Sequence, residues 1–424
     1  MKKLSSYLSL VLMLFFLLPN TSSAQANEQQ ERIKGWSADI DTLLLLMKSQ
    51  HYVYRSKPLP QQLLADAASL KTKVAQYSDE RMLNELERLM FYMHDGHSYI
   101  LPVATKVQAF FLPVQFYIFS DGVYIIDAAE PYKNLIGCKV LTIQNVAVAK
   151  LVNDMNYFIH QDNRYTVLWF APSVLRFRGL YEAYGLAAGS PAVQMNLVNQ
   201  NKKKITQNVS FIPAANFHGI PKLIPSQVAG NTPPPLYLSN VADNFWFTLL
   251  QQKKVLYFQF NQVQDKDNVS IALFSTKLDS ALQRTKPTLF IIDVRHNNGG
   301  NLELLPPLVD VIKKFESKNP GSKIIVITGR NTFSAGQVFI SLLDKDTHAL
   351  FAGEPSSSSP NFVGEGNYIS LPYSGAMGSI SNKYHETIPG DKRKWIEPVY
   401  PVSLSSIAYF KNQDPVMEFI LKIK

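Results

Sequence analysis

The chain has 424 residues, of which 46% are apolar and 18% are charged. At roughly 100–200 residues per domain, this length predicts two or three folding units, and the apolar share excludes a mainly disordered chain. The net charge is +9, but the basic residues are scattered, so we expect no nucleic-acid partner. Cys138 is the single cysteine, which excludes an intramolecular disulfide and a cysteine-based metal site.

Residues 1–24 have the layout of a secretory signal. Lys2 and Lys3 precede an apolar run, Leu8 to Leu18, and small residues follow it up to Ala24. The run is shorter than the ~20 residues that a membrane-spanning helix needs. We therefore expect cleavage after Ala24, export to the periplasm or the medium, and no stable membrane insertion of the mature protein. The sequence leaves the oligomeric state open.

Residues 25–106 predict an N-terminal helical domain. Apolar side chains recur at helical spacing from Ile40 to Met47 and again from Met82 to Met90. Ser78, followed by two acidic residues ahead of the second run, predicts the N-terminus of a helix.

Residues 107–215 predict a β-rich middle region. Short runs of β-branched and aromatic residues flank Ser120-Asp121-Gly122, which is typical of a hairpin. Two further runs, within 194–198 and 205–212, flank a Lys-rich turn, and a helical pattern near 164–186 interrupts the strands.

Residues 216–424 predict an α/β core, in which the proline-rich stretch 232–235 marks a linker and the alternation of strands and helices begins at about residue 236. Dense apolar runs at 288–294 and 323–327 alternate with helical patterns of about a dozen residues. Strands that are apolar on both faces and separated by helices indicate parallel pairing with crossover helices. The fold class is therefore α/β, with a helical domain and a β-rich region ahead of the core.

Two loops that follow these strands carry residues suited to acyl transfer, and the carboxyl ends of parallel strands are where ligands bind. Ser334 stands at a strand-to-helix turn, and the amide of Ala335 would lie at the helix N-terminus, which favours negative charge. Gly299 and Gly300 follow the neighbouring strand and let the backbone approach closely. Two amides converging beside a serine form an oxyanion hole. Taken singly, each feature is more often a tight turn or a helix cap.

A serine nucleophile needs a base. His97 follows Asp95-Gly96 at the end of the second helical run, where a glycine at a helix C-terminus turns the chain sharply. A surface histidine in a capping turn is the alternative interpretation. His296, beside the paired glycines, is the second candidate for the base.

Several motifs together resemble the tail-specific and tricorn-core serine peptidases. They are Asp293–Gly300, Thr332–Gln337 and Gly353-Glu354-Pro355, in that order and spacing. Asp95-Gly96-His97-Ser98 is similar to the Asp-Gly-His-Thr of the members that use a histidine base. Gly137–Asn145 resembles their Gly-x-Lys-Val-Leu-x-Ile-Asn-Gly segment, so the likeness spans nearly the whole mature chain.

The resemblance implies a crotonase-like ββα core, a PDZ-like or gating middle region, and hydrolysis of peptide bonds through an acyl-enzyme. Ser334 would be the nucleophile and His97 the general base. Gly299 or Gly300, together with Ala335, would supply the oxyanion hole. The implied partner is a polypeptide substrate, and neither a cofactor nor a metal is implied.

The resemblance also implies an orienting acid nearly sixty residues after the serine. Asp391 has the closest spacing, and Glu386 and Glu397 are alternatives. A second branch of the family uses a lysine about two dozen residues after the serine, but no lysine occurs here between Lys345 and Lys383. The alternative reading of the whole chain is a catalytically inactive peptide-, lipid- or retinoid-binding protein on the same fold, because a fold does not settle function.

Overall fold

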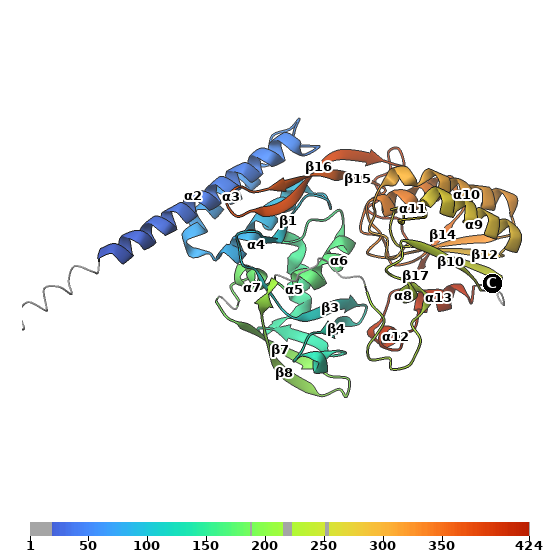
Figure 1. Ribbon diagram of the computed structural model, residues 1–424, viewed down its shortest axis with the longest axis horizontal. Helices are drawn as coiled ribbons and strands as arrows, with labels where there is room; N and C mark the ends of the chain where they lie inside the picture. The colour runs from blue at the N-terminus through green and yellow to red at the C-terminus, as the bar shows by residue number, and fades with distance from the viewer. Residues whose placement is uncertain (1–18, 187–188, 215–222, 251–253, 424) are drawn as a thin grey trace, which may run out of the picture.

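The computed structural model describes residues 19–186, 189–214, 223–250 and 254–423 (Figure 1). The predicted mixed α/β architecture, with a helical region first and several sheets after it, is confirmed. The apolar run of the signal lies outside the described residues, whereas Ala24 belongs to the first helix. Among the helices of the described ranges, none combines the length and apolar character needed to cross a bilayer.

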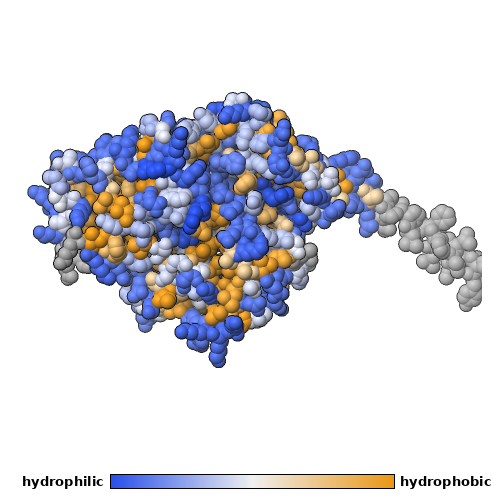
Figure 2. Space-filling view, turned by 180° about the vertical axis from the view of Figure 1, so that it is seen from behind, coloured by the Kyte–Doolittle hydropathy of each residue, from blue (hydrophilic) through white to orange (hydrophobic). Residues whose placement is uncertain are grey.

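The main elements of the described N-terminal part are the helices α2 (Pro19–Gln50), α3 (Gln61–Lys73) and α4 (Asp79–Met90) and the strand β1 (Tyr99–Ala104). Ile40, Leu43 and Met47 are fully buried on one face of α2, as predicted. Ser78 is the N-cap of α4, and its hydroxyl accepts a hydrogen bond from the Arg81 amide, which confirms the predicted helix start. The polar first turns of α2 project from the body of the molecule (Figures 1 and 2).

The middle part is built on an antiparallel sheet in the order β3-β4-β5-β7-β8. Its strands are β3 (Val114–Phe119), β4 (Gly122–Ala128), β5 (Lys139–Ile143), β7 (Ala192–Val198) and β8 (Lys204–Ser210). The predicted hairpin at 120–122 joins β3 to β4. The helices α5 (Val148–Asp154), α6 (Arg164–Val174) and α7 (Arg178–Ala183) pack against this sheet, and α6 and α7 confirm the helical pattern predicted near 164–186.

The core is a six-stranded mixed sheet in the order β10-β11-β12-β13-β14-β17. The strands are β10 (Phe245–Leu250), β11 (Val255–Phe260), β12 (Leu289–Asp293), β13 (Lys323–Thr328), β14 (Leu350–Gly353) and β17 (Tyr400–Pro401). All neighbours from β11 onward are parallel, as predicted, and β10 is antiparallel to β11. The helices α9 (Ile271–Thr285), α10 (Pro306–Lys318) and α11 (Ala335–Asp346) pack together against one face of this sheet (Figure 1).

A long hairpin leaves the core and completes the sheet of the N-terminal part. It is formed by β15 (Asn361–Ser370) and β16 (Ala376–Glu386), and β16 pairs antiparallel with β1, with Tyr99 opposite Ser379 (Figure 1). The sheet of the N-terminal part therefore takes two of its three strands from the C-terminal part of the chain. The sequence predicted strand-like alternation here without indicating that β16 pairs with β1. This pairing joins the C-terminal part of the chain to the N-terminal part.

A buried ion-pair cluster joins the core sheet to the last helix, α13 (Pro415–Ile420). The Arg295 guanidinium donates to both Asp293, at the end of β12, and Asp414. The Asp414 carboxylate also caps α13 by accepting from the amides of Val416 and Met417. Asp414 thus supports two structural features with one side chain.

We expect Asp414→Ala to lower the free energy of unfolding by about 3–5 kcal/mol, because it leaves a buried guanidinium without one partner and removes a helix cap. Urea denaturation measures the change. Glu31→Ala, which breaks an exposed pair with Lys34, is the control and is expected to change stability by less than about 1 kcal/mol. Equal effects of the two substitutions would contradict the argument.

Candidate active site

Ser334 lies at the turn between β13 and α11 in a strained backbone conformation. Its φ of 51° and ψ of −126° place it in a region that non-glycine residues rarely occupy. The turn is held by two hydrogen bonds to the neighbouring loop: the Phe333 amide donates to the Asn297 carbonyl at 3.0 Å, and the Thr332 hydroxyl to the Val294 carbonyl at 2.9 Å. Strain of this kind is maintained only where the surroundings impose it, and it clusters at functional sites.

The paired glycines lie directly against Ser334. At Gly299, where φ is 111°, a Cβ atom would stand 2.7 Å from the Cβ of Ser334 and 3.2 Å from its Oγ, so no larger residue fits. The Gly299 amide donates to the Asn297 side chain at 3.0 Å and is therefore occupied. Within the described part of the chain, no hydrogen bond involves the amides of Gly300 and Ala335. Of the three predicted oxyanion donors, these two are available.

His97 reaches this site from the other end of the chain. Its imidazole stacks on Phe333, the residue before Ser334, with ring centroids 4.4 Å apart, and on Phe362 of β15 at 5.3 Å. Both ring nitrogens are shielded from solvent and have no hydrogen-bond partner among the residues that the structure describes. Burial lowers the pKa of His97 to about 4. The fold thus brings the predicted base next to the nucleophile's turn, although no hydrogen bond joins them.

The loop that carries His97 is fixed by a buried carboxylate. Asp95 accepts hydrogen bonds from the amides of His97 and Ser98 and from the hydroxyl of Ser381 on β16. Its second oxygen contacts His51 Nε2 at 3.0 Å. Burial alone would raise the pKa of Asp95, but the hydrogen bonds with His51 and Ser381 outweigh it and lower the pKa below its usual value.

Gly96 is required for a different reason than the sequence indicated. The left-handed residue that ends the helical segment is His94, with a φ of 54°. A Cβ atom at Gly96 would instead lie 2.9 Å from Cε2 of Phe333. The glycine therefore permits the close approach of the His97 loop to the nucleophile's turn.

Asp162 holds the same loop from the other side. One of its oxygens accepts from the Gly96 amide at 2.8 Å, and the other bonds the Ser358 hydroxyl at 2.7 Å. Burial raises the pKa of this carboxyl to about 7, with a smaller contribution from the charge of Asp95, while His160 acts in the opposite direction. Asp162 therefore retains its proton in the folded protein at pH values where an unfolded chain releases it.

The pKa values of Asp162 and His97 predict opposite pH dependences of stability. His97, whose pKa falls from 6.5 to about 4, makes the free energy of unfolding decrease as the pH falls through this window, since the unfolded chain binds the proton first. Asp162, whose pKa rises from 3.8 to about 7, makes the free energy of unfolding increase as the pH falls, since the folded chain binds the proton first. Asp162→Asn should therefore steepen the loss of stability between about pH 6.5 and 4.5, by up to about 1.4 kcal/mol per pH unit.

Urea denaturation across this pH range tests the prediction. Asp154→Asn, at an exposed pair with Lys150, is the control and should leave the slope of the parent protein unchanged. A slope for Asp162→Asn equal to that of the control would show that Asp162 titrates alike in the folded and unfolded chain.

The predicted orienting acids are engaged elsewhere. Asp391 forms an ion pair with Arg393, and this interaction lowers its pKa. Glu386 accepts from the Gly390 amide at 3.1 Å. Glu397 accepts from the Trp395 ring nitrogen. None of the three carboxylates forms a hydrogen bond with the imidazole of His97, whose ring nitrogens have no such partner in the described ranges.

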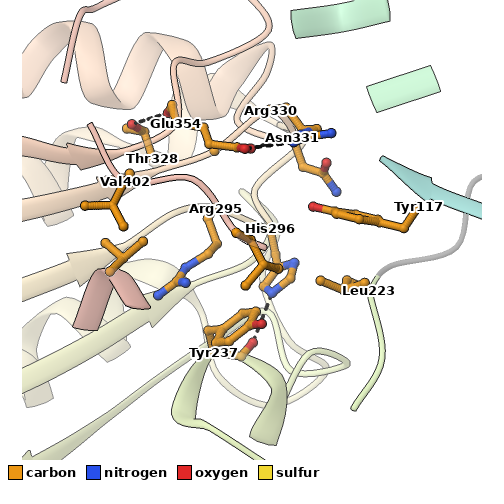
Figure 3. Close-up of a pocket in the computed structure, with 14 residues that line it drawn as sticks. Tyr117, Leu223, Tyr237, Arg295, His296, Thr328, Arg330, Asn331, Glu354 and Val402 are labelled. Carbon is orange, nitrogen blue, oxygen red and sulfur yellow. Dashed lines mark hydrogen bonds and ion pairs between the residues drawn. The ribbon is translucent and has the colours of Figure 1, made fainter. Parts of the chain in front are cut away.

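His296, the second candidate for the base, lines a separate cavity at the carboxyl ends of the core strands (Figure 3). Its Nε2 lies 3.0 Å from the Tyr237 carbonyl oxygen, and its ring stacks on Tyr237. Arg330 of the same cavity forms a two-point ion pair with Glu354. Ser334 is not among the residues that line this cavity, so His296 is not placed to serve it.

Comparison with known proteins gives a structural likeness only. No family model and no curated protein matches the sequence. The structure of mature CPAF complexed with lactacystin is 12% identical and covers 92% of this chain and 98% of its own, with a TM-score of 0.64. Mature CPAF alone is 12% identical over 92% and 96% of the two chains, with a TM-score of 0.61. A CPAF mutant is 11% identical over 92% and 97%, with a TM-score of 0.62.

These matches extend over nearly the entire length of both chains, so the arrangement of all three parts is shared. CPAF is one of the tail-specific serine peptidases. The chain therefore has the fold of that family, and the resemblance found in the sequence is confirmed at the level of the fold.

Proposed function

We propose that the protein is a serine peptidase that hydrolyses peptide bonds through an acyl-enzyme on Ser334. The observation that carries the proposal is the strained turn at Ser334, which lies against Gly299 and beside the imidazole of His97. The likeness of fold to CPAF supports the same reading. The substrate class is a polypeptide.

The chemistry follows from the position of each group. Ser334 Oγ attacks the scissile carbonyl carbon while its proton passes to His97, and the carbonyl oxygen, now negatively charged, is stabilised by the amides of Gly300 and Ala335. The C–N bond then breaks, and His97 returns the proton to the leaving amine. A water molecule attacks the acyl-enzyme ester in the same way and releases the acid. For these steps the His97 ring has to turn toward Ser334, and catalytic hydrogen bonds often form only once the substrate is bound.

Export is part of the proposal and rests on the signal-like N-terminus. The mature chain would begin after Ala24, near the start of α2. N-terminal sequencing of the protein recovered from the periplasm or medium tests this proposal, and a full-length chain retained in the cytoplasm would contradict it.

Hydrolysis of unfolded casein by the mature protein, with labelling by a fluorophosphonate probe, tests the enzymatic proposal. We expect fragments in the casein digest and a probe adduct on the peptide that contains Ser334. Lactacystin, the compound in the CPAF complex, can be tried as a second probe, and protection of Ser334 from fluorophosphonate by lactacystin is the expected result.

A binding protein without catalysis is the second candidate, and one observation favours it: His97 lies between two aromatic rings, and both of its ring nitrogens are shielded and lack a hydrogen-bond partner within the described part of the chain. A folded protein that neither labels nor hydrolyses casein, yet retains peptides with micromolar affinity, would favour this candidate over the peptidase.

A further inference from the structure

The hairpin of β15 and β16 covers the imidazole of His97 with one of its faces. Phe362 stacks on His97, and a Cβ atom at Gly364 would lie 3.2 Å from Cε1 of His97. Residues two apart on a strand share a face, and paired residues on neighbouring strands do as well. Phe362 pairs with His385 and Gly364 with Lys383, so these four positions form the face that meets His97. Because Cε1 is bonded to both ring nitrogens, the edge of the imidazole that carries them is the one nearest Gly364.

The side chain of Glu365 lies on this same face of the hairpin, because the backbone at Glu365 has a positive φ. Strict alternation would point its side chain away from the face of Gly364. Its φ is 47°, however, and its carboxylate contacts Lys383 at 3.1 Å and His385 Nε2 at 3.3 Å, both on the face that meets His97. Glycines stand on either side of it, at 364 and 366. A non-glycine residue with positive φ is uncommon and marks a place where the structure imposes the conformation.

Asp95, the other carboxylate that acts on the His97 imidazole, is already engaged in hydrogen bonds. Four titratable groups act electrostatically on its imidazole: Asp95, His160, His385 and Glu365. Asp95 is occupied by backbone amides, Ser381 and His51. Glu365 is half-exposed, and in the described residues its carboxylate contacts only side chains of β16. Ion pairs between exposed side chains are weak. Because the Glu365 carboxylate is held by side chains alone in the described residues, it can exchange its contact with His385 for one with His97.

We propose that Glu365 is the positioning carboxylate of His97. It would accept a hydrogen bond from one ring nitrogen, leave the other directed at Ser334, and stabilise the imidazolium formed during acyl transfer. The proposal rests on the proposed peptidase function and assigns to β15 the task that the sequence assigned to Asp391. His385, which stacks on Phe362 and contacts Glu365, keeps the carboxylate on this face when His97 is not paired with it.

An NMR titration of His97 tests the pair without relying on catalysis. In the mature protein labelled with ¹³C at histidine rings, the His97 signal is assigned by its loss in His97→Gln. A carboxylate near an imidazole favours the charged form, so Glu365→Gln is expected to lower the His97 pKa, and Glu365→Asp to restore it in part. Asp391→Asn and Glu386→Gln are the matched controls and should leave the His97 titration as in the parent.

Labelling by the fluorophosphonate probe adds a functional readout. Glu365→Gln should slow labelling of Ser334 at neutral pH by at least about 100-fold and shift the pH profile, with partial rescue by Glu365→Asp. An unchanged His97 titration in Glu365→Gln, or a shift in Asp391→Asn instead, would overturn the assignment. A parent protein that does not label would contradict the proposed function, while the titration would still support or overturn the Glu365–His97 pair.

Discussion

Ser334→Ala is expected to abolish labelling by the fluorophosphonate probe and to reduce casein hydrolysis by at least about 10⁴-fold. Removing a nucleophile that acts together with a base costs nearly the whole contribution of covalent catalysis. The fold should survive, because Ser334 is only half-buried and its hydroxyl takes part in no hydrogen bond within the described ranges. Alanine at a φ of 51° is as strained as serine, so we expect the free energy of unfolding to change by less than about 1 kcal/mol.

A matched control is available at another helix N-terminus. Ser270 caps α9, and its hydroxyl accepts a hydrogen bond from the Leu273 amide. Ser270→Ala should cost about 1 kcal/mol of stability and leave labelling and hydrolysis unchanged. The two variants are thus expected to differ in opposite ways: Ser334→Ala loses activity and keeps its stability, whereas Ser270→Ala loses stability and keeps its activity. Full labelling of Ser334→Ala would mean that another residue is the nucleophile.

The α/β core could be predicted because its strands and helices are indicated by the pattern of apolar residues within short stretches of the sequence. The runs 288–294 and 323–327 became β12 and β13, which are buried on both faces, and the alternation with helices fixed their parallel pairing. The position of Ser334 at a strand-to-helix turn follows from the same pattern. Its φ of 51° does not, since the turn is held by hydrogen bonds that it donates to the loop at Asn297, which is distant in sequence.

The hairpin of β15 and β16 shows what the pattern could not supply. Its alternation predicts strands, but the choice of β1 as a partner depends on contacts across almost the whole chain, such as that between Ser381 and Ser98, which are 283 residues apart. The same hairpin covers His97 with Phe362, so the surroundings of the predicted base were equally hidden.

The orienting acid was assigned by family spacing, which pointed to Asp391. A local signal against it was present in the sequence: Arg393, two residues on, forms an ion pair with that carboxylate and occupies it. Glu365 gave no signal, because alternation places it on the wrong face and only its positive φ brings it to Lys383 and His385.

Replacing His97 should cost roughly 10³- to 10⁴-fold in casein hydrolysis and in the rate of probe labelling at neutral pH, since a positioned general base contributes about this much. The ring also packs between Phe333 and Phe362, so His97→Ala removes packing as well as the base. His97→Phe separates the two, because it retains an aromatic ring in the stack and cannot accept a proton. We expect His97→Phe to unfold in urea close to the parent and to be as inactive as His97→Ala.

Two further variants complete the test of His97. Imidazole added to the medium should restore part of the labelling of His97→Ala, where the space between the two phenyl rings is open, and none of that of His97→Phe, where it is filled. His296→Phe is the control, because His296 lines the cavity shown in Figure 3, which Ser334 does not line. This variant should label at the rate of the parent. Normal labelling of His97→Phe together with loss of labelling in His296→Phe would assign the general base to His296, and normal labelling of His97→Phe alone would exclude His97 as the base.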